Sequence, residues 1–319
     1  MTLLEVRGLK THFFTRQGVV KAVDGVSFDL DRGETLGIVG ESGSGKSAMS
    51  LSLLRLISPP GEIVEGEVRF DGVDLLQLDE AQMQTYRGRH MSMILQDPLS
   101  SLNPVLTIAD QVGEGIILHD RIRGEKLQRR LIELMQLVGI PAPETRLGQY
   151  PHQLSGGMRQ RVVGAISIAC RPEFLIADEP TTALDLTIQL QYLNTLKDIQ
   201  RSENLALLLI THDLGVVAKM CDRVAVMYAG KIVETGTVED IFDRPKHPYT
   251  VALLNSAGSL DKVERLNSIE GQPPSLADLP PNCAFYERCP VRFERCLTPE
   301  VPPLFELAGG QQARCWKHE

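Results

Sequence analysis

The chain has 319 residues, of which 43% are hydrophobic and 23% charged, as is typical of a folded protein with a buried core. Its 33 Lys and Arg against 41 Asp and Glu give a formal net charge of −8, which disfavours a strongly basic nucleic-acid-binding protein. No apolar run approaches the roughly 18 residues that span a bilayer. The first ten residues carry Glu5, Arg7 and Lys10, unlike a signal peptide. We therefore expect a cytosolic protein that reaches a membrane only through partners.

Over residues 1–245, short apolar runs alternate with helical patterns. The runs at 36–39, 91–95, 174–177 and 205–210 are each followed by polar or glycine-rich residues, which predicts buried parallel strands. After Asp185 a helix is predicted, with one apolar face formed by Leu186, Leu190, Leu193, Leu196 and Ile199. Two β-rich stretches around Ala229-Gly230 predict a hairpin. Together these predicted elements indicate an α/β fold with some antiparallel sheet.

The composition changes after residue 245. Eight of the 19 prolines lie between Pro273 and Pro303, and four of the six cysteines lie beyond position 280. Neither helical nor strand periodicity persists there. We expect domain 1–245 to be followed by region 246–319. This region would consist of a linker and a small loop-rich module that has little hydrophobic core and needs an additional stabilising cross-link.

The segment GESGSGKS matches a P-loop, and it lies between the predicted strand 36–39 and the helical run AMSLSLLRL. Its glycines let backbone N–H groups turn toward phosphates, and the start of the following helix adds partial positive charge. Lysine can reach the β- and γ-phosphates, and the last serine can bind Mg²⁺. The alternative is a Gly/Ser-rich turn that fits the pattern by chance. The residues expected to contact the nucleotide are Gly40, Ser42, Gly43, Ser44, Gly45, Lys46 and Ser47.

An acidic pair follows the predicted strand 174–177. Asp178 at the end of that strand is placed to hold the Mg²⁺ shell, and Glu179 is placed to polarise an attacking water as a general base. The alternative for adjacent acids at a strand end is a solvated loop. The P-loop upstream favours the catalytic interpretation.

A second glycine-rich element, LSGGM at 154–158, precedes the helical run VVGAISIAC. Ser155 can cap that helix, and Gly156 and Gly157 leave backbone amides open to a phosphate. By itself this pattern is usually just an N-cap. Its position between a P-loop and an acidic strand end favours an anion-binding role.

Taken in order, these segments resemble an ATP-binding cassette (ABC) ATPase. The resemblance also includes Gln96 after the strand 91–95, Ala183-Leu184-Asp185, and His212 after the strand 205–210. Four longer segments, 94–104, 150–161, 178–185 and RPKHPYT at 244–250, resemble the oligopeptide/dipeptide importers. The resemblance implies a parallel core sheet, an antiparallel β subdomain, a helical signature subdomain at about 97–165, and an oligopeptide-transporter-type C-terminal region.

The same resemblance implies catalytic roles for several side chains. Mg²⁺ would be bound by Ser47, Gln96 and Asp178, and His212 would contact the γ-phosphate and hold Glu179 and water in place. Without the other motifs, Gln96 and His212 would be ordinary loop residues. The intact set implies a site that hydrolyses ATP.

The family's cassettes pair head to tail around two ATP molecules. Ser155, Gly156 and Gly157 would then contact the γ-phosphate held by the partner, and Asp185 would lie across the interface. Phe13 is the expected ring against the adenine; its neighbour Phe14 is the alternative, and either ring could instead be a core residue. One departure is Met158, where many ABC proteins have Gln, and we expect it to cost little.

The C-terminal cysteines Cys283, Cys289, Cys296 and Cys315 have the spacing C-x5-C-x6-C-x18-C. Disulfides are disfavoured in a reducing cytosol. Structural zinc sites usually contain closely spaced cysteine pairs, whereas four thiolates can also hold a [4Fe–4S] cluster. The chemistry leaves zinc and iron–sulfur equally open. Similarity to the dipeptide-permease ATPase favours a structural iron–sulfur cluster.

The resemblance implies a peptide-importer ATPase at the cytoplasmic face of the membrane. Its partners would be a second, related ATPase subunit, two transmembrane permease subunits and, indirectly, an extracytoplasmic solute-binding protein, with no nucleic acid. The alternatives are the same role for nickel, glutathione or another small solute, and a soluble ABC ATPase. His247 in RPKHPYT is expected in a surface turn.

Overall fold

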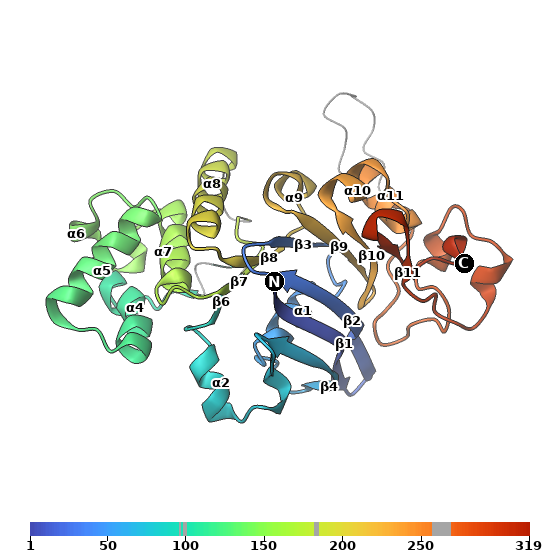
Figure 1. The fold of residues 1–319 in the computed structure, drawn as a ribbon, viewed down its shortest axis with the longest axis horizontal. Coiled ribbons are helices and arrows are strands. Elements are labelled where there is room, and N and C mark those ends of the chain that lie inside the picture. The colour runs from blue at the N-terminus through green and yellow to red at the C-terminus, as the bar shows by residue number, and fades with distance from the viewer. Residues whose placement is uncertain (96, 98–100, 182–184, 257–268) are drawn as a thin grey trace. The chain divides into compact units, whose positions relative to one another are not determined.

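The computed structural model describes residues 1–319 except 96, 98–100, 182–184 and 257–268. The described chain forms two compact units (Figure 1). We call one the P-loop unit; it comprises Thr2–Leu30, Thr35–Leu76 and Ile210–Glu319. The other, the signature unit, comprises Met1, Asp31–Glu34 and Gln77–Leu209. Among the described helices, none is both long enough and apolar enough to cross a membrane.

Two sets of strands build the P-loop unit. The first has the order β2-β1-β4-β5, with β1 Thr2–Thr15, β2 Gly18–Asp31, β4 Gly61–Phe70 and β5 Val73–Asp74. The second has the order β11-β12-β10-β9-β3, with β3 Thr35–Val39, β9 Arg223–Tyr228, β10 Lys231–Thr237, β11 Phe305–Glu306 and β12 Gln312–Ala313. Strand β3 is buried throughout and runs parallel to β9, as its continuous apolar sequence predicts.

Helix α1 (Lys46–Leu53) follows β3 in the same unit. Buried Thr11 and Ser52 hydroxyls, 2.7 Å apart, connect β1 to α1. The predicted hairpin is confirmed as β9 and β10, which pair antiparallel. Its two turn residues, Ala229 and Gly230, have φ of 47° and 79°. Positive φ at both positions matches the turn that the twist of paired strands favours.

The signature unit holds strands β6 (Met91–Ile94), β7 (Phe174–Asp178) and, as far as Leu209, β8 (Ala206–Ile210), in the order β8-β7-β6. Every residue of β7 and β8 is buried, and β6 is parallel to β7, so the three predicted strands are confirmed. The unit's helices are α2 Glu80–Tyr86, α4 Ile108–Gly115, η2 Ile116–Asp120, α5 Gly124–Leu137, α6 Pro143–Arg146, η3 Pro151–Gln153, α7 Gly156–Ile168 and α8 Leu186–Ser202. Figure 1 shows α4, α5, α6 and α7 gathered in one helical group.

The predicted helix after Asp185 is α8, but its predicted apolar face is buried along only part of its length. Leu193, Leu196 and Ile199 are at most 4% exposed, whereas Leu186 and Leu190 are 71% and 41% exposed. The predicted helix is confirmed, and a neighbour covers its apolar face only beyond the first two turns. Periodicity identifies the face of a helix but not how far a neighbour extends along it.

The chain beyond residue 237 consists of short elements that attach to the rest of the P-loop unit. It forms α10 (Val238–Asp243), α11 (Pro248–Ser256), two short strands and the 3₁₀ turns η4 Tyr286–Arg288, η5 Glu294–Leu297, η6 Ala308–Gly310 and η7 Trp316–His318. Strand β12 pairs with β10, which places Ala313 opposite Glu234. As expected, the described part of region 246–319 buries few apolar side chains, and those near Phe285 pack on β9 and β10.

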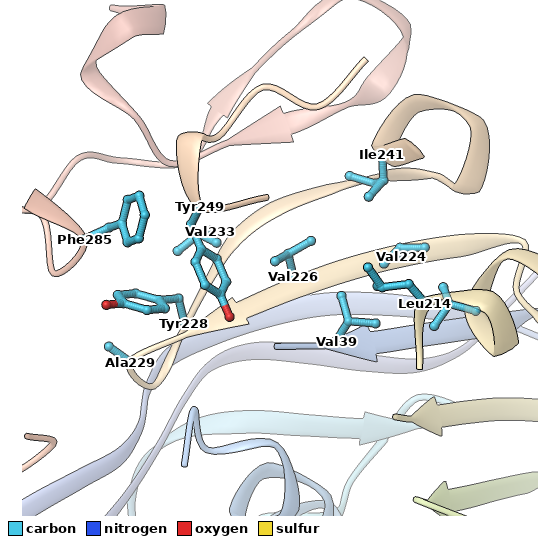
Figure 2. Packing of buried hydrophobic residues seen from close by; sticks show 11 residues of the cluster. Val39, Leu214, Val224, Val226, Tyr228, Ala229, Val233, Ile241, Tyr249 and Phe285 are labelled. Atoms are coloured by element: carbon cyan, nitrogen blue, oxygen red, sulfur yellow. The ribbon is translucent and has the colours of Figure 1, made fainter. Parts of the chain in front are cut away.

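Figure 2 shows the core that makes this attachment. Phe285 is 1% exposed, and its ring lies 5.4 Å from those of Tyr228 and Tyr249, which are themselves 4.4 Å apart. Such aromatic contacts add to the stabilisation from burial. The domain boundary predicted near residue 245 remains a prediction, since residues on both sides of it belong to the P-loop unit.

Candidate nucleotide-binding site

The loop from Gly40 to Ser47 joins β3 to α1, and two of its glycines lie where no side chain fits. Gly40 and Gly45 have φ of 155° and 104°. A Cβ at Gly40 would lie 2.1 Å from the Met227 carbonyl oxygen, and one at Gly45 would lie 2.0 Å from the Ala22 carbonyl oxygen. Only glycine allows the loop to pass this close to β9 and β2. The predicted P-loop is therefore built on a requirement for glycine.

The inside of this loop is suited to an anion. Gly45 is the N-cap of α1 and provides no side-chain hydrogen bond, which leaves the helix's first N–H groups for a ligand. The Lys46 ammonium is 7% exposed and donates to the carbonyl oxygens of Gly40, at 2.8 Å, and Glu41, at 2.9 Å. A positive charge held at the start of a helix is the arrangement that binds phosphate. Ser42, Gly43 and Ser47 are exposed, and Ser44 is buried.

The predicted acidic pair lies in the signature unit, at the end of β7. Asp178 is 4% exposed and Glu179 is half-buried. Glu179 has φ of 47°, an uncommon conformation for a residue with a Cβ, and it precedes Pro180. Strained backbone of this kind concentrates at functional sites because the surrounding structure must hold it. The carboxylate of Asp178 is also a hard oxygen ligand of the type that Mg²⁺ prefers.

The signature segment and Asp185 line one cleft in the signature unit. Ser155 caps α7 by accepting from the Met158 N–H at 3.3 Å. Asp185 caps α8 by accepting from the N–H groups of Thr187 and Ile188 at 3.1 Å and 3.0 Å. The cleft has a volume of about 700 Å³ and also contains Gly139, Pro141, Gly156, Gly157, Met158, Arg161, Ile188 and Gln191. The N-terminus of α7 favours an anionic ligand in this cleft, whereas the first N–H groups of α8 are taken by the Asp185 carboxylate.

Of the remaining predicted residues, His212, Phe13 and Phe14 belong to the P-loop unit. His212 is exposed directly after β8, and the following residue, Asp213, caps α9 (Leu214–Met220). Phe13 is half-buried, its ring 2.6 Å from where a Cβ of Gly61 would be, whereas Phe14 is 47% exposed. Gln96 lies outside the described residues, as do 183 and 184 of the Ala-Leu-Asp segment.

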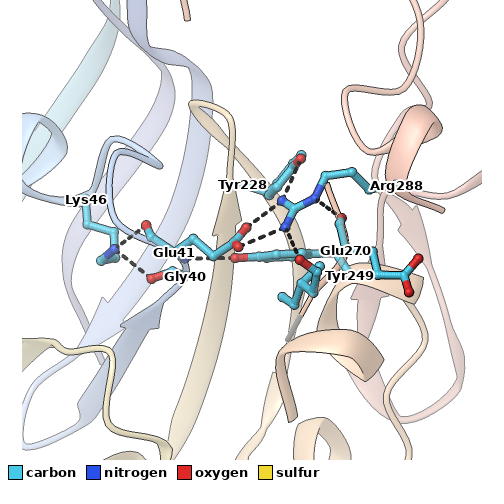
Figure 3. A network of polar contacts seen from close by, with 8 residues as sticks. Gly40, Glu41, Lys46, Tyr228, Tyr249, Glu270 and Arg288 are labelled. Carbon is cyan, nitrogen blue, oxygen red and sulfur yellow. Dashed lines mark hydrogen bonds and ion pairs between the residues drawn. The ribbon is translucent and has the colours of Figure 1, made fainter. Parts of the chain in front are cut away.

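Sequence reasoning did not find the contacts that hold the P-loop from outside (Figure 3). The Glu41 carboxylate accepts both ends of the Arg288 guanidinium, at 2.7 Å and 3.0 Å, and the Glu41 N–H donates to the Tyr249 hydroxyl at 2.8 Å. The hydrogen bonds to Glu41 raise the pKa of Arg288 above its ordinary value. The presence of Glu41 within the predicted phosphate-binding loop was a signal that a basic side chain must neutralise its charge. Nothing in the sequence indicated which one.

The four C-terminal cysteines converge. Cys283, Cys289, Cys296 and Cys315 all line one small cavity, together with Phe285 and Trp316 among others. None of the chain's six cysteines, all of them described, forms a disulfide. Within the described ranges, no three His, Cys, Asp or Glu side chains are arranged to hold a metal ion. Burial, followed by the neighbouring thiols, raises the pKa of Cys283 to about 11.

His247 is not in a surface turn, so that expectation was wrong. Its side chain is 1% exposed, and Nδ1 accepts from the Tyr249 N–H at 3.0 Å. The His247 N–H itself donates to the buried Glu234 carboxylate at 2.8 Å. Glu234 also accepts from the Lys246 N–H and from the Gln311 side chain. The Glu234 carboxylate accepts hydrogen bonds from the RPKHPYT segment and so holds it in the interior. The local Pro- and Lys-rich sequence did not indicate this contact.

Comparison with known proteins supports the resemblance to ABC ATPases that the sequence motifs indicated. The family model described as "ABC transporter" matches residues 23–182, and "Oligopeptide/dipeptide transporter, C-terminal region" matches residues 233–296. The chain is similar to the oligopeptide transport ATP-binding protein AppD of Bacillus subtilis, with 48% identity over 100% of this chain and 97% of the relative. The dipeptide transport ATP-binding protein DppD of Escherichia coli is 47% identical over 99% of this chain and 96% of the relative.

Among solved structures, the fold matches the dimeric ATP-binding cassette MJ0796 bound to ADP and Pi. The TM-score is 0.67 at 26% identity, covering 74% of this chain and 99% of that one. The predicted P-loop cassette fold, with parallel and antiparallel sheet, is thereby confirmed. The chain belongs to the ABC transporter family of ATPases, as an ATP-binding subunit with the oligopeptide/dipeptide transporter C-terminal region.

Proposed function

We propose that this ATPase energises the import of di- or oligopeptides across the cytoplasmic membrane. The observation that carries the energising role is the glycine loop with the Lys46 ammonium buried inside it. The peptide cargo is supported by the match of the C-terminal region and by the names of the relatives. We take residues 1–245 as the ATP-binding domain and 246–319 as the C-terminal region.

In this proposal the loop N–H groups and Lys46 bind the β- and γ-phosphates. By the family's pattern, Ser47, Asp178 and Gln96 would hold Mg²⁺, and the bound ion would neutralise charge on the phosphates. Glu179 orients and deprotonates the attacking water, and His212 positions that water against the γ-phosphate. The half-buried ring of Phe13 is the one proposed to stack on adenine, and the more exposed ring of Phe14 is its alternative.

The signature cleft would bind the γ-phosphate of an ATP held by a related partner cassette. Ser155 already accepts a hydrogen bond, so its hydroxyl proton remains available to donate to a phosphate oxygen. Gly156 and Gly157 expose backbone at the start of α7, and Asp185 lines the same cleft. Pairing would then require the terminal phosphate and end with its release. The solved cassette that this chain resembles is described as dimeric.

The partners follow from the family. The ATPase would act at the cytoplasmic face of the membrane with a related ATPase subunit and two permease subunits, and a solute-binding protein would deliver cargo outside. No nucleic acid takes part. Import of nickel, glutathione or another small solute is the main alternative, and a soluble ABC ATPase is a more distant one.

We also propose that Cys283, Cys289, Cys296 and Cys315 hold a [4Fe–4S] cluster. The support is that all four line the same cavity. A four-iron cluster keeps its thiolates farther apart than a single zinc ion does, so the lack of a compact ion site among the described residues is compatible with it. The cluster would fasten the C-terminal region.

The proposed function is tested with three variants in cells and in purified transporter. Lys46→Ala abolishes ATP binding and peptide uptake. Glu179→Gln keeps ATP binding and lowers hydrolysis by about 100-fold or more. Lys126→Ala, an exposed lysine, is the matched control. Full peptide uptake by the Lys46 variant would refute the role. If the Lys46 variant loses uptake of nickel or glutathione instead of peptide, the cargo is that solute. Co-purification of the parent protein with ribosomes would favour the soluble ABC ATPase.

The cluster is tested separately by anaerobic purification. We expect about four iron and four acid-labile sulfide per chain with a visible absorption band. Cys289→Ser lowers both contents, whereas Cys170→Ser, outside the proposed cluster, leaves them unchanged. Stoichiometric zinc in the parent protein would contradict the proposal.

A further inference from the structure

Arg288 connects the C-terminal region to the P-loop (Figure 3). It lies in η4, directly before Cys289, and its side chain is 4% exposed. Its guanidinium meets both carboxylate oxygens of Glu41, at 2.7 Å and 3.0 Å. Paired N–H donors on a carboxylate form one of the stronger contacts between side chains, with a fixed geometry. The two residues are 247 positions apart in sequence, so this contact exists only in the folded chain.

The guanidinium is itself held in place. Its Nη1 donates to the Tyr228 hydroxyl at 3.2 Å, and its Nε donates to the Glu270 carbonyl oxygen at 2.9 Å. From the other side, the Tyr249 hydroxyl accepts the Glu41 N–H at 2.8 Å. The Glu41 carbonyl oxygen in turn accepts from the Lys46 ammonium at 2.9 Å. A continuous set of contacts therefore leads from η4 to the lysine that binds phosphate.

The charges explain why such a contact is needed. Glu41 is an acid inside a loop that binds a polyanion, and its side chain is only 26% exposed. An unpaired carboxylate there would repel the phosphates, and partial burial would limit screening by water. Arg288 neutralises that charge and is itself buried by Tyr228 and Phe285, each of whose rings is 5.8 Å from it.

We propose that Arg288 is a positioning residue for nucleotide binding, through which the C-terminal region controls the affinity of the P-loop for ATP. This inference rests on the proposed phosphate-binding role of the loop. It adds that the P-loop binds ATP with full affinity only when Arg288 of η4 is paired with Glu41. A displacement of η4 from the P-loop would weaken ATP binding without touching any nucleotide contact.

The experiment measures binding of Mg²⁺–mant-ATP and the KM and kcat of ATP hydrolysis in the full chain. Arg288→Ala raises the Kd and KM about tenfold, the effect of one uncompensated charge near the phosphates, and changes kcat by less than about twofold. Arg288→Lys has an intermediate effect, because an ammonium replaces the charge but not the paired contact. Arg292→Ala, in the same region and exposed, is the matched control and binds as the parent does.

The decisive variant combines Arg288→Ala with Glu41→Gln. If repulsion by Glu41 causes the defect, the double variant binds ATP within about threefold of the parent, and Glu41→Gln alone binds at least as tightly as the parent. A merely structural role for Arg288 predicts no such rescue, and that result overturns the inference, as does unchanged affinity in Arg288→Ala. Lys46→Ala distinguishes failure of the Arg288 inference from failure of the proposed phosphate site. If this variant retains full affinity for ATP, the phosphate site itself is refuted.

Discussion

The buried histidine gives the most quantitative prediction. His247 lies in the loop before α11, its ring 6.0 Å from that of Phe285, and burial lowers its pKa to about 3. The positive charge of Arg314 nearby also lowers the pKa of His247. As a neutral ring, His247 accepts the Tyr249 N–H through Nδ1. Protonation would destroy that hydrogen bond.

The sign of the pH effect follows from proton binding. In the unfolded chain His247 takes up a proton below pH about 6.5, whereas in the folded chain it stays neutral until about pH 3. Between these values the unfolded state binds more protons, so stability falls as the pH falls. The slope approaches about 1.4 kcal/mol per pH unit, so this residue removes roughly 2 kcal/mol between pH 7.5 and pH 5.

The assay is urea unfolding at pH 7.5, 6 and 5, followed by fluorescence of Trp316, the chain's single tryptophan, which is 7% exposed. His247→Asn keeps an acceptor for the Tyr249 N–H but cannot be protonated, so it loses about 2 kcal/mol less than the parent on acidification. Glu234, whose pKa burial raises, is present in both proteins and cancels in the comparison. His152→Asn removes an exposed histidine and serves as control. Equal losses in the parent and His247→Asn would refute the reasoning.

Three further substitutions test other parts of the structure. Gly45→Ala places a Cβ 2.0 Å from a carbonyl oxygen at a φ of 104°, so mant-ATP binding is lost; measurable binding at parental affinity would show that the loop can relax. Phe285→Ala lowers the free energy of unfolding by about 3–5 kcal/mol in urea titrations, because it empties the aromatic core that attaches the C-terminal region; a loss below about 1 kcal/mol would contradict this. Ser155→Ala removes the cap of α7, costs about 1 kcal/mol and weakens ATP-dependent pairing with the partner cassette, measured by analytical ultracentrifugation; undiminished pairing would exclude its hydroxyl from the interface.

Local sequence predicted much of the fold and of the candidate site. The strands β3, β6, β7 and β8 are continuous apolar runs, and burial on both faces requires such runs. The P-loop was predictable because its glycines and lysine are contiguous, and its close approach to Met227 and Ala22 requires glycine. The cap at Ser155 was predictable because capping depends on groups within one helical turn.

Long-range packing was not predictable. Leu186 and Leu190 fit the apolar face of α8 but are exposed, and His247 lies in a Pro- and Lys-rich segment but is buried. In both cases the outcome depends on which distant segment covers the residue.

The amino-acid sequence alone determined the chemistry that we propose for this protein, since the groups proposed to bind phosphate, Mg²⁺ and water lie in short contiguous motifs whose conformations are set locally. Only the tertiary structure decided how the C-terminal region meets that chemistry. Arg288 reaches Glu41, and the four cysteines share one cavity, because β12 pairs with β10 and Phe285 packs on β9. No local spacing encodes those contacts, because an ion pair between distant segments depends on the path of the whole chain between them.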